Sequence, residues 1–191
     1  MARKPDPDAR DRILDIASRL FDQHGVRAVG LQQIIDECGC GKNLLYREFG
    51  SKDELVAAYL ERCRQDWSAI LDQGAAAAPG DPAGQLVAIV AIAAEQATTP
   101  GYRGCSLHNA HAEFPETDHA ASEVLAVHFT GRRQRLQEIA QAAGAQDPLA
   151  LADRILLILD GLSANGATMG RHGPATAAVA FAEDVIKTSL R

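Results

Sequence analysis

The side chains with the clearest chemical potential lie between residues 42 and 47, where polar groups recur at helical spacing. Residues one, three and four positions apart share one side of a helix, and this side would carry Lys42, Asn43, Tyr46 and Arg47. Lysine, arginine and asparagine read base edges in the major groove, and tyrosine can bond phosphate. The pattern therefore predicts a helix face that contacts DNA.

Two short helices joined by a tight turn would position this face. Residues 31–38 place apolar side chains at helical spacing, and Gly39 is a typical helix stop. Helical periodicity resumes at Lys42, with Leu45 and Phe49 on the apolar side. Two short helices around a glycine-containing turn form the helix-turn-helix pattern, whose second helix enters the major groove.

A capping box follows the second short helix and marks the start of a long one. The Ser51 hydroxyl should accept an early backbone N–H of this helix, and Glu54 should reach back to the cap.

Residues 39–55 (GCGKNLLYREFGSKDEL) resemble the recognition segment of the tetracycline-repressor (TetR) family. The likeness rests on a glycine turn, a lysine, Leu-Tyr-x-x-Phe and Ser-Lys-x-Glu-Leu, all in register. Residues 103–115 also resemble a segment of actinobacterial-type members. The resemblance implies a ligand-responsive regulator, most often a repressor. Such a protein binds a palindromic double-stranded operator as a homodimer and is released by a small-molecule effector.

The periodicity predicts an all-α fold with two domains. Residues 1–51 would form a three-helix helix-turn-helix DNA-binding domain, and residues 52–191 a six-helix ligand-binding and dimerisation domain. The first helix is expected to start at Asp6-Pro7. The six later helices are expected at 52–71, 82–98, 105–113, 117–143, 148–170 and from Gly173-Pro174 onward, with a linker at 74–80.

Composition limits the class of protein. The net charge of −6 argues against non-specific coating of nucleic acid. Residues 1–52 hold nine basic and eight acidic side chains, so the acidity belongs to the rest of the chain. The longest apolar run is far shorter than the roughly 20 residues that a membrane-spanning helix needs. The N-terminus lacks the apolar segment of a signal peptide, so we expect a cytoplasmic protein with no membrane partner.

Seven residues are the expected DNA contacts. Asn43 and Arg47 are the expected base readers, Lys42 and Gln33 would serve bases and phosphates, and Arg27 would bind phosphate. The resemblance implies that Tyr46 and Lys52 hold the DNA backbone.

The chain departs from the family pattern at three positions. Gly30, Gly41 and Leu44 stand where hydroxyl-bearing residues are common. Phosphate binding would therefore depend more heavily on the basic side chains and Tyr46.

The resemblance also implies a ligand pocket inside the second domain. The expected lining consists of large side chains on alanine-rich helices: Trp67, Tyr102, His108, Phe114, Phe129 and Met169. Any of them could instead be ordinary core. Arg132, Arg133 and Arg135 are expected on the solvent-exposed side of their helix. No cofactor is expected, and the sequence does not identify the effector.

The last two helices would form the homodimer interface that the resemblance implies. Residues 155–159 are apolar almost all round, which indicates burial on more than one face. Gly161, Ala164, Gly166 and Gly170 keep one side of this helix thin enough for another backbone to approach.

Other functions are open on the sequence. His108 and His111 would share a helix face, which leaves a metal-responsive regulator possible. Glu116-x-x-His119 matches half of a di-iron motif, but the second copy and the further glutamates are missing. Cys38 and Cys40 are expected to be packed thiols, with a redox sensor as the alternative. A helical interaction protein with a degenerate DNA reader is also compatible.

Enzymatic function is not expected. The chain has no Gly-x-Ser-x-Gly motif and no glycine-rich phosphate loop.

Overall fold

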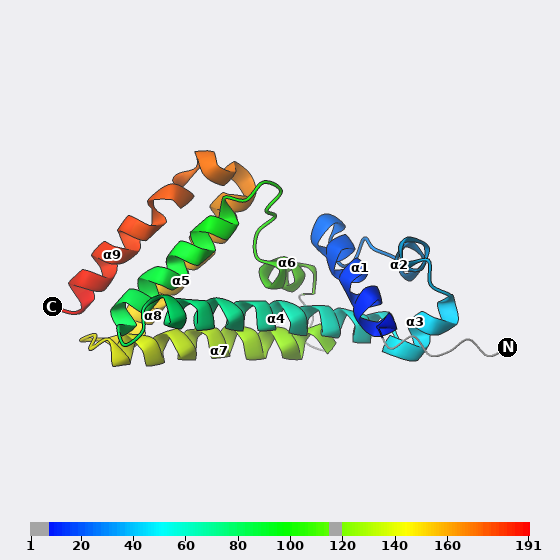
Figure 1. The fold of residues 1–191 in the computed structure, drawn as a ribbon, viewed down its shortest axis with the longest axis horizontal. Coiled ribbons are helices and arrows are strands. Elements are labelled where there is room, and N and C mark those ends of the chain that lie inside the picture. Colours follow the sequence, from blue (N-terminus) through cyan, green and yellow to red (C-terminus); the bar gives the residue numbers. More distant parts are fainter. Residues whose placement is uncertain (1–7, 115–119) are drawn as a thin grey trace. The chain divides into compact units, whose positions relative to one another are not determined.

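The computed structural model describes residues 8–114 and 120–191, and every regular element within them is helical (Figure 1). The predicted all-α class is therefore confirmed. The elements are α1 (Ala9–His24), α2 (Leu31–Cys38), α3 (Lys42–Phe49), α4 (Lys52–Ala77), α5 (Pro82–Ala97), α6 (Ser106–Glu113), α7 (Ala120–Ala142), α8 (Pro148–Met169), the 3-10 turns η1 (Gly170–His172) and η2 (Pro174–Ala177), and α9 (Ala178–Ser189). The expected start at Asp6-Pro7 and residues 117–119 of the seventh helix lie outside the described residues.

The chain divides into two compact units. The first comprises residues 1–63 and 106–125, and the second comprises residues 64–105 and 126–191. Helix α6 therefore belongs with the N-terminal helices, although it follows α5 in the sequence.

In the first unit, α1 braces the two short helices. Phe21, Ile34 and Phe49, which come from α1, α2 and α3, are all buried, and α1 packs against both short helices. The guanidinium group of Arg10 on α1 lies 4.2 Å from the centre of the Phe49 ring. Burial of these apolar faces holds the short helices in place.

Asp22 connects α1 with both α4 and α6. Its carboxylate accepts the Tyr59 hydroxyl at 2.5 Å and the Ser106 hydroxyl at 2.7 Å. Burial raises the pKa of Tyr59 above its ordinary value, so the phenol keeps its proton and stays a donor. Two helices distant in sequence are thereby fixed to the same face of α1.

The second unit is built around α5, which packs against both α8 and α9. Its core includes Leu86, Ile89, Leu151 and Ile155, all fully buried. Helices α5 and α8 start as predicted, because Asp81 accepts the Gly84 N–H and Asp147 accepts the Ala150 N–H, each at 3.0 Å.

Three expectations about this unit are wrong. Helix α4 continues to Ala77 and does not end near residue 71, since buried Gly74 lets α4 approach α5: a Cβ there would lie 2.6 Å from Ile89 Cγ1. The last helix begins at Ala178, after the 3-10 turn that Pro174 opens. Arg132 is buried, whereas Arg133 and Arg135 are exposed as expected.

The glycines of α8 serve different purposes. Gly166 lies against the end of α5, where a Cβ would be 2.6 Å from the Ala97 carbonyl oxygen. At Gly161, an added Cβ would have no neighbouring atom within 4 Å. The close approach therefore occurs within one chain at Gly166, and the surface around Gly161 is open.

Over the two described stretches, no helix is long and apolar enough to cross a membrane.

Gly166→Ala should lower the free energy of unfolding by about 1–3 kcal/mol, because the new methyl group meets α5 backbone that cannot move aside easily. The matched control is Gly131→Ala in α7, where no atom lies within 4 Å of the added Cβ. This control should gain up to about 1 kcal/mol from helix propensity. Chemical denaturation of both variants measures the difference, and equal effects would contradict the packing role of Gly166.

Candidate nucleic-acid interface

Helix α3 divides into a buried side and an exposed side. Leu45 and Phe49 are 0% and 1% exposed. The exposed side carries the polar residues that the sequence grouped together: Lys42, Asn43, Tyr46 and Arg47. The turn before it depends on Gly39, whose φ of 61° is left-handed and therefore favours glycine.

The charges on α3 are partly held by neighbours. The Arg47 Nη2 and Nε atoms donate to Glu48 Oε1 at 2.8 and 3.0 Å. The Lys42 ammonium lies 5.7 Å from the centre of the Tyr46 ring. Arg47 must leave an exposed ion pair, of small energetic worth, before it can bind another anion.

The two glycine N-caps leave the starts of α2 and α3 open. Gly30 and Gly41 have extended backbones and provide no side-chain cap. A Cβ at either position would meet nothing within 4 Å, so no contact requires glycine there. The first backbone N–H groups of both helices can therefore face an anion without an intervening hydroxyl.

The three other expected contact residues also belong to this unit. Gln33 on α2 and Arg27 before it are exposed, and the Arg27 guanidinium lies 5.4 Å from the centre of the Phe114 ring. Lys52 is half-buried at the start of α4. Burial lowers the pKa of Lys52, while the nearby Glu113 and Asp53 carboxylates act in the opposite direction.

Glu113 is a positioning residue that sequence reasoning missed. Its carboxylate accepts the Val26 N–H at 3.0 Å and the Arg27 N–H at 2.6 Å, so it clamps the loop before α2. Gly25, with a φ of 87°, makes room for it, since a Cβ there would lie 3.0 Å from Oε1. No local signal could reveal this contact, because its partners are 87 positions apart.

Only one half of the predicted capping box forms as expected. The Ser51 hydroxyl accepts the Glu54 N–H at 3.1 Å. The Ser51 N–H donates to the Phe49 carbonyl at 2.6 Å, which ties the turn to the end of α3. The Glu54 carboxylate lies beside Gly50, where a Cβ would be 2.9 Å from Oε2.

The expected ligand-pocket residues fall in both units. His108 and Phe114 belong to the first unit. In the second, the Trp67 and Phe129 rings both lie near His128, with ring centres 6.4 and 5.2 Å away.

Tyr102 and Met169 have other surroundings in the second unit. The Tyr102 hydroxyl donates to Ser163 at 3.4 Å, and burial raises its pKa. Met169 is 48% exposed. Trp67 and Phe129 are thus the two residues of the predicted set that meet at a common side chain.

The cysteine and metal alternatives can be compared with the geometry. Burial and the neighbouring Cys38 raise the pKa of the Cys40 thiol to about 11, which keeps the reactive thiolate scarce at neutral pH. Among the described residues, no three His, Cys, Asp or Glu side chains come together as metal ligands. Glu116 and His119 of the half di-iron motif lie outside the described residues.

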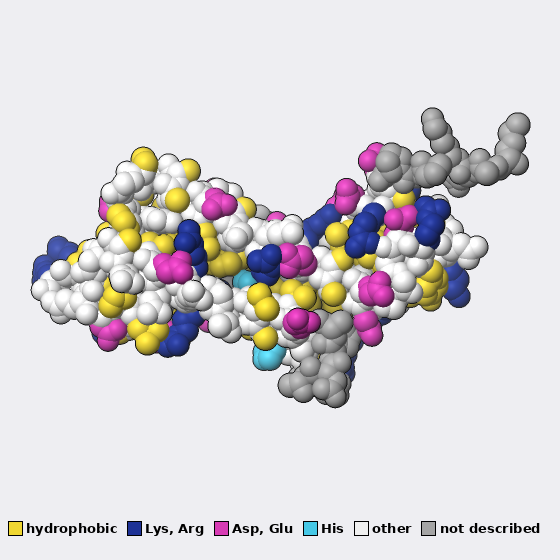
Figure 2. Space-filling model, turned by 90° about the horizontal axis from the view of Figure 1, so that it is seen from below, with side chains coloured by type: hydrophobic (Ala, Val, Ile, Leu, Met, Phe, Trp, Pro, Cys, Tyr) yellow, Lys and Arg dark blue, Asp and Glu magenta, His cyan; other side chains and the backbone are white. Residues whose placement is uncertain are grey.

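The molecular surface carries charges of both signs. On the face in Figure 2, dark blue basic and magenta acidic side chains are interspersed, with yellow apolar groups between them. Any nucleic-acid recognition would therefore depend on individual side chains at defined positions more than on attraction by the net charge.

Comparison with known proteins agrees with this geometry. The family described as "Bacterial regulatory proteins, tetR family" matches residues 13–59, which extend from α1 into α4. An HTH-type transcriptional regulator from Mycobacterium tuberculosis is 44% identical over 54 residues, and one from Staphylococcus aureus is 38% identical over 60 residues. The first match covers 28% of this chain and 27% of the relative, and the second covers 31% and 32%. The likeness to these relatives therefore spans less than a third of either chain.

Solved structures extend the likeness to nearly the whole chain. A TetR-family transcriptional regulator from Streptomyces coelicolor has a TM-score of 0.90 and 27% identity over 96% of this chain and 97% of its own. A putative TetR transcriptional regulator from Streptomyces avermitilis has a TM-score of 0.80 and 25% identity over 95% and 97%. The fold and the exposed polar side of α3 define a helix-turn-helix protein. Residues 13–59 match the TetR family, and nearly the whole chain is similar to a solved TetR-family transcriptional regulator.

Glu113→Ala should loosen the loop before α2, because the Val26 and Arg27 amides lose a shared acceptor worth about 1–2 kcal/mol. Hydrogen exchange at these two amides should accelerate, while exchange in the α5 and α8 core stays unchanged. The control is Glu95→Ala, which removes an exposed carboxylate from α5 in the other unit. Unchanged protection of the loop in Glu113→Ala would refute the clamp.

Proposed function

We propose that this protein is a ligand-responsive transcriptional regulator that binds a palindromic operator as a homodimer and acts as a repressor. The observation that carries the proposal is the division of α3, where a buried apolar side fixes an exposed polar side. The match of residues 13–59 to the TetR family and the names of the bacterial relatives support the same function. A regulator of bacterial genes works where the DNA is, so we also infer a cytoplasmic location.

Each expected contact residue has a proposed role on DNA. Asn43 and Arg47 read base edges in the major groove, and Lys42 and Gln33 serve bases and phosphates. Tyr46, Lys52 and Arg27 bind the phosphate backbone, together with the backbone N–H groups at the starts of α2 and α3. Glu113 contributes indirectly, since it fixes the loop that carries Arg27 and lies near Lys52.

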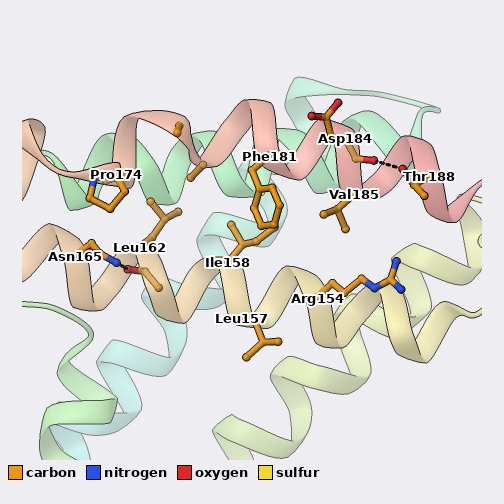
Figure 3. A pocket seen from close by; sticks show the side chains of 14 residues that line it. Arg154, Leu157, Ile158, Leu162, Asn165, Pro174, Phe181, Asp184, Val185 and Thr188 are labelled. Carbon is orange, nitrogen blue, oxygen red and sulfur yellow. Dashed lines mark hydrogen bonds between the residues drawn. The ribbon is translucent and has the colours of Figure 1, made fainter.

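The homodimer is proposed to form through α8 and α9. A groove of about 720 Å³ runs between these helices, and Leu157 and Phe181 are 72% and 59% exposed at it (Figure 3). Exposed apolar side chains of this size on a soluble chain typically mark an interface. Gly161, with open space above it, would let a partner helix approach closely.

Effector binding is proposed to favour a conformation that cannot bind the operator. A ligand that binds this conformation about 100-fold more tightly shifts the equilibrium away from the DNA-binding state by about 2.7 kcal/mol. The ratio of the ligand's affinities for the two conformations, and not their absolute size, determines this shift.

The test is a gel shift with DNA from immediately upstream of the protein's own gene. The wild-type protein should give a salt-sensitive shift, because each neutralised phosphate contributes about −0.9 to the slope of log affinity against log salt. The shift should disappear in the Tyr46→Ala, Lys52→Ala double variant. A correctly folded dimer that shifts neither this DNA nor a random operator library would favour a helical interaction protein.

The single variants separate the two kinds of contact. Lys52→Ala should weaken binding to all sequences alike and reduce the salt slope by about one. Asn43→Ala should relax specificity at one base position by about 1–3 kcal/mol. Binding-site selection from a randomised library measures specificity, and gel shifts at several salt concentrations measure the salt slope. Equal loss of specificity in the two variants would refute the division of roles.

The proposed interface has its own test. Phe181→Glu should shift the protein from dimer to monomer in analytical ultracentrifugation, because a carboxylate would be buried without a partner. Val127→Glu is the control, since Val127 on α7 is also apolar and 57% exposed but does not line the groove. Dimers of equal stability in both variants would place the interface elsewhere.

A further inference from the structure

The second unit contains a buried positive charge. Arg132 of α7 is 7% exposed, and its Nη1 atom donates to Asp160 of α8 at 2.8 Å. The guanidinium carbon lies 4.8 Å from the centre of the Trp67 ring on α4. A buried guanidinium normally uses most of its donors, because leaving them without acceptors is costly.

Two buried donors at this place have no acceptor. Both Arg132 Nε and Trp67 Nε1 are shielded from solvent and make no hydrogen bond. Asp160 satisfies Nη1 only, and its side chain is 42% exposed. Buried polar groups in folded proteins are nearly always hydrogen-bonded, so two neighbouring exceptions of the same type point to a missing acceptor.

A cavity adjoins the two residues that carry these donors. It has a volume of about 310 Å³, and Trp67, Arg132 and His128 line it together with apolar Leu71 and Val127. Its charged lining is predominantly basic, with Arg64 and Arg135 besides Arg132 and only Asp72 of opposite sign. In a chain of net charge −6, this lining is locally favourable for an anion.

The donor set restricts the type of anion. A carboxylate has two oxygens in one plane and can accept one N–H at each of them, which matches two free donors. A phosphate dianion has three acceptor oxygens and a larger charge, for which a guanidinium already paired with Asp160 offers too few buried donors. The apolar walls favour an occupant with a small aromatic or aliphatic body, and the volume is at the lower end for small-molecule sites.

We propose that the cavity between α4 and α7 binds a small monocarboxylate through Arg132 and Trp67, and that this compound is the effector. The assignment of the site as an effector site rests on the proposed regulatory function, whereas binding itself does not. Occupancy would act directly on α4, the helix whose first turn carries Lys52.

The chain provides its own probe, because Trp67 is its one tryptophan. Benzoate, phenylacetate and hexanoate are titrated while Trp67 fluorescence is recorded, with the neutral amides and inorganic phosphate as comparisons. At least one carboxylate should give a saturable change and bind at least tenfold more tightly than its amide. A response that is absent for all three, or equal for amide or phosphate, would overturn the proposal.

Two variants separate binding from folding. Arg132→Met should abolish the carboxylate response while the protein remains folded, because the Asp160 side chain is 42% exposed and can be hydrated once its partner is removed. Arg133→Gln, on the same helix but outside the cavity, should bind like the wild type. Trp67→Phe keeps an aromatic ring and removes one donor, so the rise in Tm caused by the carboxylate should become smaller. Undiminished binding in Arg132→Met would refute the site.

The regulatory consequence is measured separately. The bound carboxylate should release the wild-type protein, but not Arg132→Met, from DNA in the gel shift. Binding without any DNA shift would refute the proposed function and leave the site intact. A DNA shift without carboxylate binding would support the proposed function and refute the carboxylate site.

Discussion

The structure depends most on the burial of three short apolar faces against one another. Helices α2 and α3 have eight residues each, which is below the roughly 12–15 residues at which an isolated helix becomes stable in water. They persist because Ile34 and Phe49 pack with Phe21 of α1 in a common core. The same burial orients α3, since a helix with Leu45 and Phe49 inside must turn Asn43 and Arg47 outward.

Helix α6 adds a second constraint to the N-terminal unit. One end is held by the Ser106–Asp22 bond, and the other end holds the loop before α2 through Glu113. Asp22 also accepts from Tyr59, so α4 and α6 share an anchor on α1. A displacement of α6 would therefore change the position of the Arg27 backbone and the electrostatic surroundings of Lys52. A movement of α6 could in this way alter the two proposed phosphate-binding residues Arg27 and Lys52.

The second unit combines a conventional apolar core with one unusual group. Helices α5 and α8 bury aliphatic side chains in a common core, yet Arg132 lies inside with a single acidic partner. A charge in such surroundings is a poor source of stability, because its desolvation offsets the ion pair. The arrangement is easier to understand as a means of recognising an anion, next to the cavity that Trp67 and His128 line.

The sequence alone determined the features that depend on neighbouring residues. Asp81-Pro82 and Asp147-Pro148 start helices, Gly39 ends one, and the spacing of Lys42 to Arg47 defines the polar face, because caps and periodicity are local properties. The resemblance of residues 39–55 pointed to the TetR family, whose model matches residues 13–59.

Only the tertiary structure decided features whose partners are distant in the chain. Gly74 suggested a linker by its helix propensity, but close packing against Ile89 retains it within α4. Arg132 sits where helical periodicity allowed an exposed side chain, and Trp67 and Asp160 keep it buried. Glu113 finds its acceptor role 87 positions from Val26. Such pairings follow from the packing of helices, which no local pattern encodes.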